Sequence, residues 1–186
     1  DVDTDDNGIV THSKVNSIDY IGSFGGFGVS VAYVNDGSGG SSDSSMVLTY
    51  DGLMDGLQLG YGQGEDSVDL DLETIFVKYT VGGITAAFQR SELDGAGSSS
   101  DEDSDALGVS FAINENLSVS YGTHDVDFGA ANKADEESSG VSASYTMGSM
   151  TITGISNSTD NVAGTDASND AYREVTIAFA FSVLDR

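Results

Sequence analysis

The N-terminus holds a group of potential metal ligands. The stretch DTDDNGIVTHSK places Asp3, Asp5, Asn7 and Gly8 where an EF-hand loop begins, and carboxylate and amide oxygens are ligands that Ca²⁺ prefers. The position of the closing bidentate glutamate is taken by Lys14, and no helical pattern flanks the stretch. The sequence therefore predicts no EF-hand. It predicts at most loosely bound Ca²⁺, with Asp3, Asp5 and Asn7 as candidate ligands.

Few residues of the chain could act in catalysis. The only imidazoles are His12 and His124, there is no cysteine, and no Gly-x-Ser-x-Gly motif occurs. His124 with Asp125 or Asp127 is the one pairing that could resemble a hydrolase site. We therefore expect no enzyme and assign no catalytic residue.

Composition excludes one class of partner. The chain of 186 residues carries 31 acidic and 6 basic residues, a formal net charge of −25. Nucleic acid needs basic side chains to neutralise its phosphates, so we expect no such partner. The chain starts at Asp1 with no signal-like segment, which predicts a mature product or a fragment.

Alternation with a period of two runs through the whole sequence and predicts an all-β protein without helices. No stretch is long and apolar enough for a membrane-spanning helix, although membrane strands need only about 9–11 residues each. The eleven expected strands are residues 14–22, 27–34, 45–50, 57–62, 72–81, 84–91, 106–113, 117–123, 140–147, 150–156 and 172–181.

The connections between these strands alternate between two kinds. Short ones such as SFGG and GG supply the positive φ angles of tight hairpins. Long ones such as NDGSGGSSDSS, LDGAGSSSDEDSD, HDVDFGAANKADEES and STDNVAGTDASND are acidic and rich in serine and glycine. Short turns at one end and long polar loops at the other are typical of a transmembrane β-barrel of the outer membrane.

The two parities of each expected strand differ in chemistry. In residues 27–34, Val29, Val31 and Tyr33 share one face, while the other carries Gly28, Ser30 and Ala32. Aromatic residues fall near strand ends on the apolar parity, as in the two girdles of a membrane barrel. One face should meet lipid and the other a water-filled lumen. The alternative is a secreted or surface β-sheet adhesin, or a calcium-binding module, without a channel.

Two stretches resemble a known family. KVNSIDYIGSFGGFGVSVAY, residues 14–33, is similar to the strand pair after the constriction loop of Gram-negative general diffusion porins, and YREVTIAFAF, residues 172–181, is similar to their final strand. The Asp-, Ser- and Gly-rich style resembles the alphaproteobacterial type. The resemblance implies an outer-membrane protein that contacts lipid, forms a homotrimer, and allows passive diffusion of ions and small hydrophilic solutes.

The resemblance also implies an organisation. Such porins have sixteen strands, and the matched strand is the sixth, which leaves the eleven that the alternation predicts. Residues 1–13 would be the end of the constriction loop, residues 14–181 barrel strands, and residues 182–186 a tail. Phe179 and Phe181 would form the assembly signal at the end of the last strand. An isolated piece would leave two unpaired sheet edges, so we expect it to aggregate.

Charged residues at the expected pore follow from the same resemblance. Lys14 occupies a position where the family has a pore-lining base, and parity places Asp19 and Lys78 toward the lumen. The candidate constriction set is Asp1, Asp3, Asp5, Asp6, Lys14, Asp19 and Lys78. The acidic excess predicts weak cation selectivity. Arg90 and Arg173 have the lipid-facing parity near outer strand ends, where they could reach lipid head groups.

Overall fold

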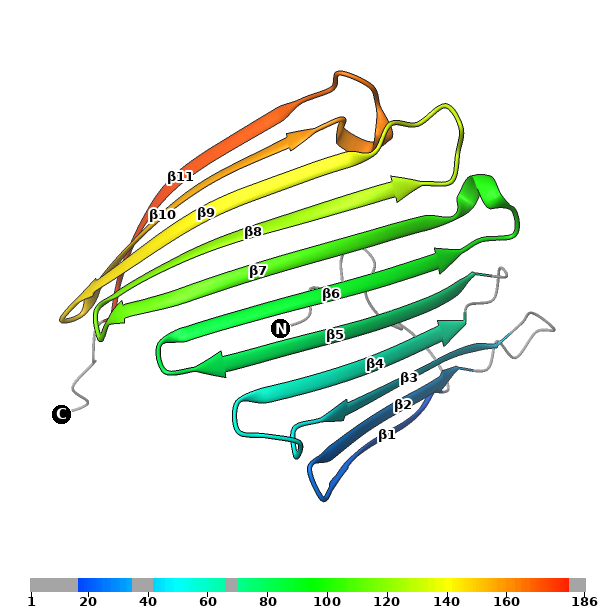
Figure 1. Ribbon diagram of the computed structural model, residues 1–186, viewed down its shortest axis with the longest axis horizontal. Helices are drawn as coiled ribbons and strands as arrows, with labels where there is room; N and C mark the ends of the chain where they lie inside the picture. The colour runs from blue at the N-terminus through cyan, green and yellow to red at the C-terminus, as the bar shows by residue number, and fades with distance from the viewer. Residues whose placement is uncertain (1–16, 35–41, 66–69, 181–186) are drawn as a thin grey trace, which may run out of the picture.

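The computed structural model describes residues 17–34, 42–65 and 70–180. They form one antiparallel sheet whose eleven strands lie in sequence order (Figure 1), as the alternation predicted. The strands are β1 Ser17–Phe24, β2 Phe27–Val34, β3 Asp43–Tyr50, β4 Leu57–Glu65, β5 Asp71–Val81, β6 Ile84–Asp94, β7 Glu102–Asn114, β8 Leu117–Phe128, β9 Glu136–Met147, β10 Met150–Asp160 and β11 Asp170–Phe179.

The short turns depend on residues that tolerate a left-handed backbone. Gly25 and Gly26 between β1 and β2 have φ of 57° and 84°, and Gly82 between β5 and β6 has φ of 57°. Between β7 and β8, the Asn114 side-chain oxygen accepts hydrogen bonds from the backbone N–H groups of Asn116 and Leu117, at 2.9 and 3.0 Å. These local choices close the hairpins tightly and fix the register of each strand pair.

The strands are longer at the long-loop end than the sequence predicted. β7 begins at Glu102 and β8 continues to Phe128, in stretches expected to be loop. The same correction applies to β9, which begins at Glu136, and to β10, which ends at Asp160. In β7, β9 and β10 both faces of these added residues are polar, and in β8 Val126 and Phe128 lie on the face that is polar elsewhere. The apolar alternation of the strand centres therefore stops although the strand pairing continues.

Two of the long connections pack against each other. The Phe128 ring lies under the Lys133 ammonium, which is 4.1 Å from the ring centroid. The turn η2 (Val162–Gly164) donates from the Ala163 backbone N–H to the Glu136 carboxylate at 2.6 Å. A second short turn, η1 (Ser98–Ser100), lies between β6 and β7. The acidic loops at this end are therefore partly folded onto one another.

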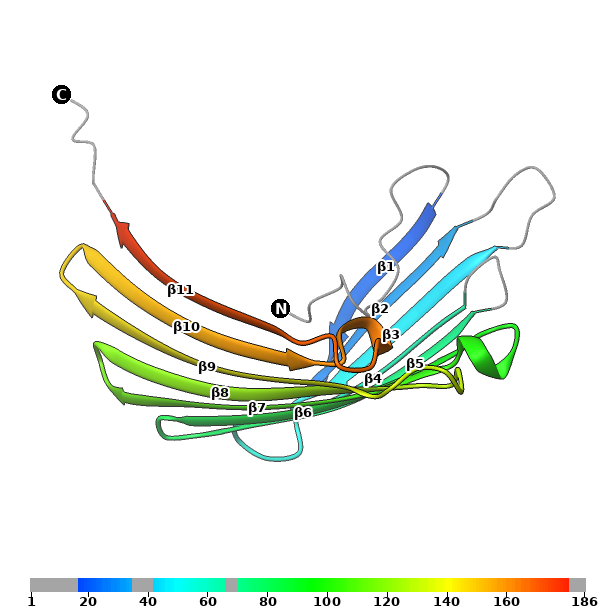
Figure 2. The ribbon, with the colours of Figure 1, turned by 90° about the horizontal axis from the view of Figure 1, so that it is seen from above.

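The sheet is strongly curled but not closed, with β1 and β11 as its two edges (Figure 2). Across the described ranges, Val34 and Val126 are the only buried hydrophobic residues. No helix in the described part of the chain is long and apolar enough to cross a membrane. A sheet of this size without an apolar core must place its hydrophobic face against something other than the rest of the chain.

Candidate functional site

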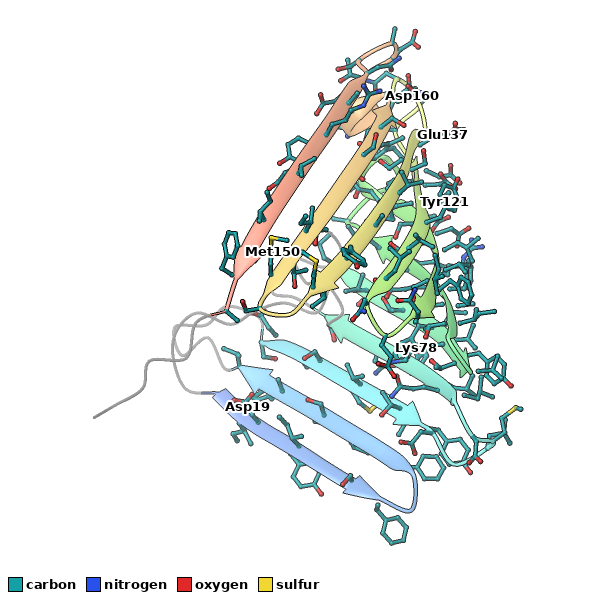
Figure 3. The ribbon with its side chains drawn as sticks, turned by 90° about the vertical axis from the view of Figure 1, so that its left-hand side faces the viewer. Asp19, Lys78, Tyr121, Glu137, Met150 and Asp160 are labelled. Atoms are coloured by element: carbon teal, nitrogen blue, oxygen red, sulfur yellow. The ribbon has the colours of Figure 1, made fainter. Side chains whose placement is uncertain are left out.

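The register divides the sheet into two faces of different chemistry. Thr49 pairs with Gly60 and Tyr50 with Leu59, so small or polar residues share one face and apolar residues the other. We call these the polar face and the apolar face. Tyr121, on the apolar face, stands on the convex side of the curled sheet (Figure 3). The polar face therefore lines the concave side.

Small residues and hydroxyl groups dominate the polar face. Cross-strand hydroxyl pairs join neighbouring strands: Thr74–Ser91 at 2.7 Å, Ser120–Ser142 at 2.8 Å, Ser138–Thr159 at 2.9 Å, Thr146–Thr151 at 3.1 Å and Ser144–Thr153 at 3.2 Å. These side chains are satisfied by one another and are too short to fill a wide enclosed space. Such a surface of short polar side chains is suited to contact with water.

Apolar side chains also occur on this face, which the alternation in the sequence did not predict. Leu72 pairs with Leu93, and Phe76 pairs with Gly60. A Cβ added at Gly60 would lie 1.9 Å from the Phe76 ring, so the glycine makes room for this ring to lie against the sheet. Only the strand pairing reveals this combination, because the two residues are far apart in sequence.

The candidate pore residues divide into two groups. Asp19 in β1 and Lys78 in β5 lie exposed on the polar face, with Lys78 opposite Gln58 and Ala87. The role of Asp19 and Lys78 in a pore constriction stays a prediction. The other members lie outside the described residues: Asp1, Asp3, Asp5, Asp6 and Lys14. Of the two residues of the predicted assembly signal, Phe179 is the last residue of β11 and lies on the apolar face. Phe181 lies outside the described residues.

The apolar face carries a band of exposed aliphatic and aromatic side chains. Leu107, Tyr121 and Val141 are 47%, 50% and 51% exposed, although all three lie within strands. At the short-turn end the rings of Phe27 and Tyr50 stack with centroids 4.3 Å apart. Tyr33 lies six residues from Phe27 on the same face, about 20 Å along the strand. This spacing approaches the height of the lipid-facing band of a membrane barrel, about 25 Å.

The band crosses the register obliquely. Along one row of paired residues, Leu48, Tyr61 and Ile75 are followed on the next strands by Arg90, Asp105 and Asp125. Barrel strands tilt by about 35–45°, so a plane parallel to the membrane crosses each successive strand at a shifted residue. The slanted boundary between apolar and charged residues matches such a tilt.

Beyond the band, the apolar parity becomes acidic. Glu73, Glu92, Asp103 and Asp127 pair in succession across β5 to β8, and we call them the acidic row. Next to this row, the Arg90 guanidinium forms salt bridges to two carboxylates. Its Nε lies 3.0 Å from Glu92 Oε1, and its Nη1 lies 3.9 Å from Asp105 Oδ2. These ion pairs are nearly half exposed, so solvent screens them and they contribute little to stability. The acidic row thus places like charges opposite each other on neighbouring strands, which is destabilising.

Asp127 shows the electrostatic effect of the acidic row. It lies six residues past Tyr121 in β8, well beyond the band of exposed apolar side chains. Partial desolvation, followed by the carboxylates of Asp135, Asp103, Asp105 and Asp125, raises the pKa of Asp127. The folded protein therefore holds a proton at Asp127 more tightly than the unfolded chain. This contribution to stability is complete below the ordinary pKa of 3.8 and is lost as the pH rises through the raised value.

Asp127→Asn is therefore expected to stabilise the intact protein near neutral pH, by up to roughly 1 kcal/mol, because it removes a carboxylate opposite Asp103. The gain should shrink on acidification and in high salt. Urea unfolding at several pH values measures it. Asp166→Asn, in an exposed loop, removes the same charge as the control. An equal gain for both variants, or a gain independent of pH, would contradict the explanation.

The remaining candidate chemistry is not assembled. His124 lies on the polar face opposite Ala106 and Ser138, whereas Asp125 and Asp127 have the other parity. Within the described ranges, no group of three or more His, Cys, Asp or Glu residues is arranged to hold a metal ion. The candidate calcium ligands Asp3, Asp5 and Asn7 lie outside those ranges, so loose Ca²⁺ binding stays a prediction.

Comparison with known proteins agrees with this geometry. A model of the Gram-negative porin family matches residues 2–164. A solved mutant of the Rh. blastica porin has a TM-score of 0.63 and 17% sequence identity, covering 89% of this chain and 55% of that chain. An anion-selective porin from Comamonas acidovorans has a TM-score of 0.65 and 17% identity, covering 89% and 59%. The comparison with curated proteins found no match.

The chain spans a little more than half the length of these solved porins. Its open sheet of eleven strands is accordingly a partial porin β-barrel, with the polar face toward the lumen side. The family model covers most of the chain, and the polar and apolar faces are arranged as in a barrel wall. The chain belongs to the Gram-negative porin family and therefore to the outer membrane.

Proposed function

We propose that this chain forms part of the wall of a water-filled channel through which ions and small hydrophilic solutes diffuse passively. The observation that carries the proposal is the division of one continuous sheet into an apolar face and a polar face. In lipid, a sheet must close into a barrel so that no backbone edge is left unpaired. The polar face would then surround water, and no ligand or bond-breaking step is needed for solutes to pass.

A weak preference for cations is the finer part of the proposal. The charged residues on the described polar face are mostly carboxylates: Asp19, Asp43, Glu102, Glu136, Asp170 and Glu174, with Lys78 as the one lysine or arginine. Charges lining a pore select ions of the opposite sign. The anion selectivity of the Comamonas porin belongs to that protein, because 17% identity carries the fold alone.

Partners follow from the same proposal. The apolar face would contact outer-membrane lipid, and the intact protein would assemble as a homotrimer, as the resemblance to general diffusion porins implies. Both are open to direct measurement on detergent-extracted protein. A surface module without a channel is not favoured, because it would leave the apolar face exposed to water.

Planar-bilayer conductance of the intact protein under a KCl gradient tests the channel and its selectivity together. We expect stepwise openings and a reversal potential of cationic sign. Glu174→Gln should lower the permeability ratio of K⁺ to Cl⁻, on the order of twofold, and Lys78→Gln should raise it. Both residues lie on the polar face.

Glu73→Gln is the matched control, because it removes one carboxylate from the apolar parity, outside the lumen. We expect it to leave the permeability ratio close to that of the parent. An anionic reversal potential would overturn the cation preference but leave the channel standing. Absence of openings from folded protein that resists SDS until heated would overturn the channel itself.

A further inference from the structure

The apolar face contains a groove between β8 and β11 that the channel does not use. It has a volume of 580 Å³, and its apolar-face lining includes Val119, Val141, Gly154 and Val175. The groove opens on this face, because two neighbouring apolar-face rows flank it. One row runs from Val119 through Ala143 and Gly154 to Val175, and the other includes Val141, Ser156 and Arg173. The rest of its lining is the polar-face row between them: Ser120, Ser142, Ile155 and Glu174.

Gly154 creates the gap in this surface. Its φ is not positive, and a Cβ added there would meet no atom within 4 Å. Neither backbone conformation nor close packing therefore requires glycine at this position. Glycine inside a strand weakens the strand and often marks a place where a ligand approaches closely. The neighbouring row at the short-turn side is bulky, with Tyr145, Ile152 and Ile177 paired in succession.

Arg173 provides a charge at the other end of the groove. It is exposed, lies two residues before Val175 on the same face, and forms no salt bridge within the described part of the chain. Phe179 lies six residues further along β11, about 20 Å away, at the short-turn end. Arg173 therefore lies near the outer edge of the band, at the level where lipid head groups begin.

We propose that this groove binds one acyl chain of a phosphate-bearing lipid, with the phosphate held by Arg173. Charge decides in favour of an anionic lipid. The same parity further along β5 to β8 is acidic and repels anions, and the cation there, Arg90, is already engaged by Glu92 and Asp105. Arginine binds phosphate through short charge-assisted hydrogen bonds. The inference rests on the proposed function in one respect: the apolar face must lie in lipid.

The test uses the intact protein, delipidated in detergent, and native mass spectrometry. The probes are dimyristoyl phosphatidic acid and dimyristoylglycerol, which has the same chains and no phosphate. We expect one phosphatidic acid per chain to bind more tightly than dimyristoylglycerol. Arg173→Gln should weaken phosphatidic acid binding about tenfold and leave dimyristoylglycerol binding unchanged. Inorganic phosphate in millimolar amounts should not displace the lipid, because the acyl chain supplies much of the affinity.

Gly154→Leu should fill the groove and weaken binding of both lipids, and the open space at its Cβ lets the variant fold. Gly108→Leu is its control, since Gly108 also has open space around its Cβ but lies on the polar face. Arg90→Gln is the control for Arg173→Gln. Unchanged lipid affinity in Gly154→Leu would overturn the proposal. So would dissociation of an oligomer by Gly154→Leu, which would show that a second copy of the chain fills the groove.

Conductance of the same preparations separates this inference from the proposed function. Gly154→Leu should keep the parent conductance while losing the lipid. A parent protein that binds the lipid but conducts no ions would refute the channel alone, and a conducting parent without selective phosphatidic acid binding would refute the groove alone.

Discussion

Val109→Arg is expected to lower the free energy of unfolding of the intact protein in a bilayer by about 2–4 kcal/mol, the cost of an arginine at mid-membrane on the lipid face of a barrel. Val109 lies in β7 between Leu107 and Phe111 on the apolar face, is 41% exposed, and pairs with Ala86 and Tyr121. Neither of its pairing partners, Ala86 and Tyr121, carries a negative charge that could neutralise the guanidinium, so the charge would have to remain in hydrocarbon or distort the bilayer.

Ser110→Arg is the matched control, because it places the same residue one position along the same strand on the other face. Ser110 is exposed on the polar face, opposite Thr85 and Ser120. In a water-filled lumen the guanidinium stays hydrated, so a change below about 1 kcal/mol is expected. Unfolding of both variants by guanidinium chloride in lipid vesicles measures the difference in their free energies of unfolding. A larger cost for Ser110→Arg would show that the faces have been assigned the wrong way round, and equal costs would show that the two faces do not meet different solvents.

The sequence alone was sufficient for the number of strands and for their two faces. Alternation in stretches such as residues 107–111 predicts which side chains share a face, and glycine in the short connections predicts the hairpins. It failed at the outer strand ends. Both faces of Glu102 to Asp105 are polar, and in Asp125 to Phe128 the charged residues take the parity that is apolar elsewhere in the strand. There the backbone ladder of the neighbouring strands, not hydrophobic patterning, maintains the strand.

The arrangement across strands was also beyond a single sequence. Parity placed Asp19 and Lys78 on the lumen side, but it did not reveal that Phe76 lies over Gly60. The acidic row is another example, since its four carboxylates come from four separate strands. The one available signal for the groove was a glycine at the apolar parity of β10, Gly154, and only the register of β8 to β11 shows the gap that it leaves.

Gly56→Asn is expected to destabilise the intact protein by at least about 2 kcal/mol more than Gly148→Asn. Both glycines lie in short turns and have a positive φ. Gly56 has φ of 80° and Gly148 has φ of 61°. Asparagine tolerates the left-handed region better than most residues, so the backbone preference costs little at either site. The two sites differ in space. A Cβ at Gly56 would lie 2.0 Å from the backbone oxygen of Thr80, whereas a Cβ at Gly148 meets nothing within 4 Å.

The clash at Gly56 has no easy relief. The Thr80 backbone N–H donates to the Gly56 carbonyl at 2.8 Å, so moving the two chains apart breaks the hydrogen bond that joins the β3–β4 turn to β5. Overpacking of this kind costs roughly 1–3 kcal/mol before the lost hydrogen bond is counted. Urea unfolding of both variants in lipid gives the comparison. If Gly56→Asn is as stable as Gly148→Asn, the close approach of Gly56 to Thr80 is not a feature of the folded barrel, and the turn must take another conformation there.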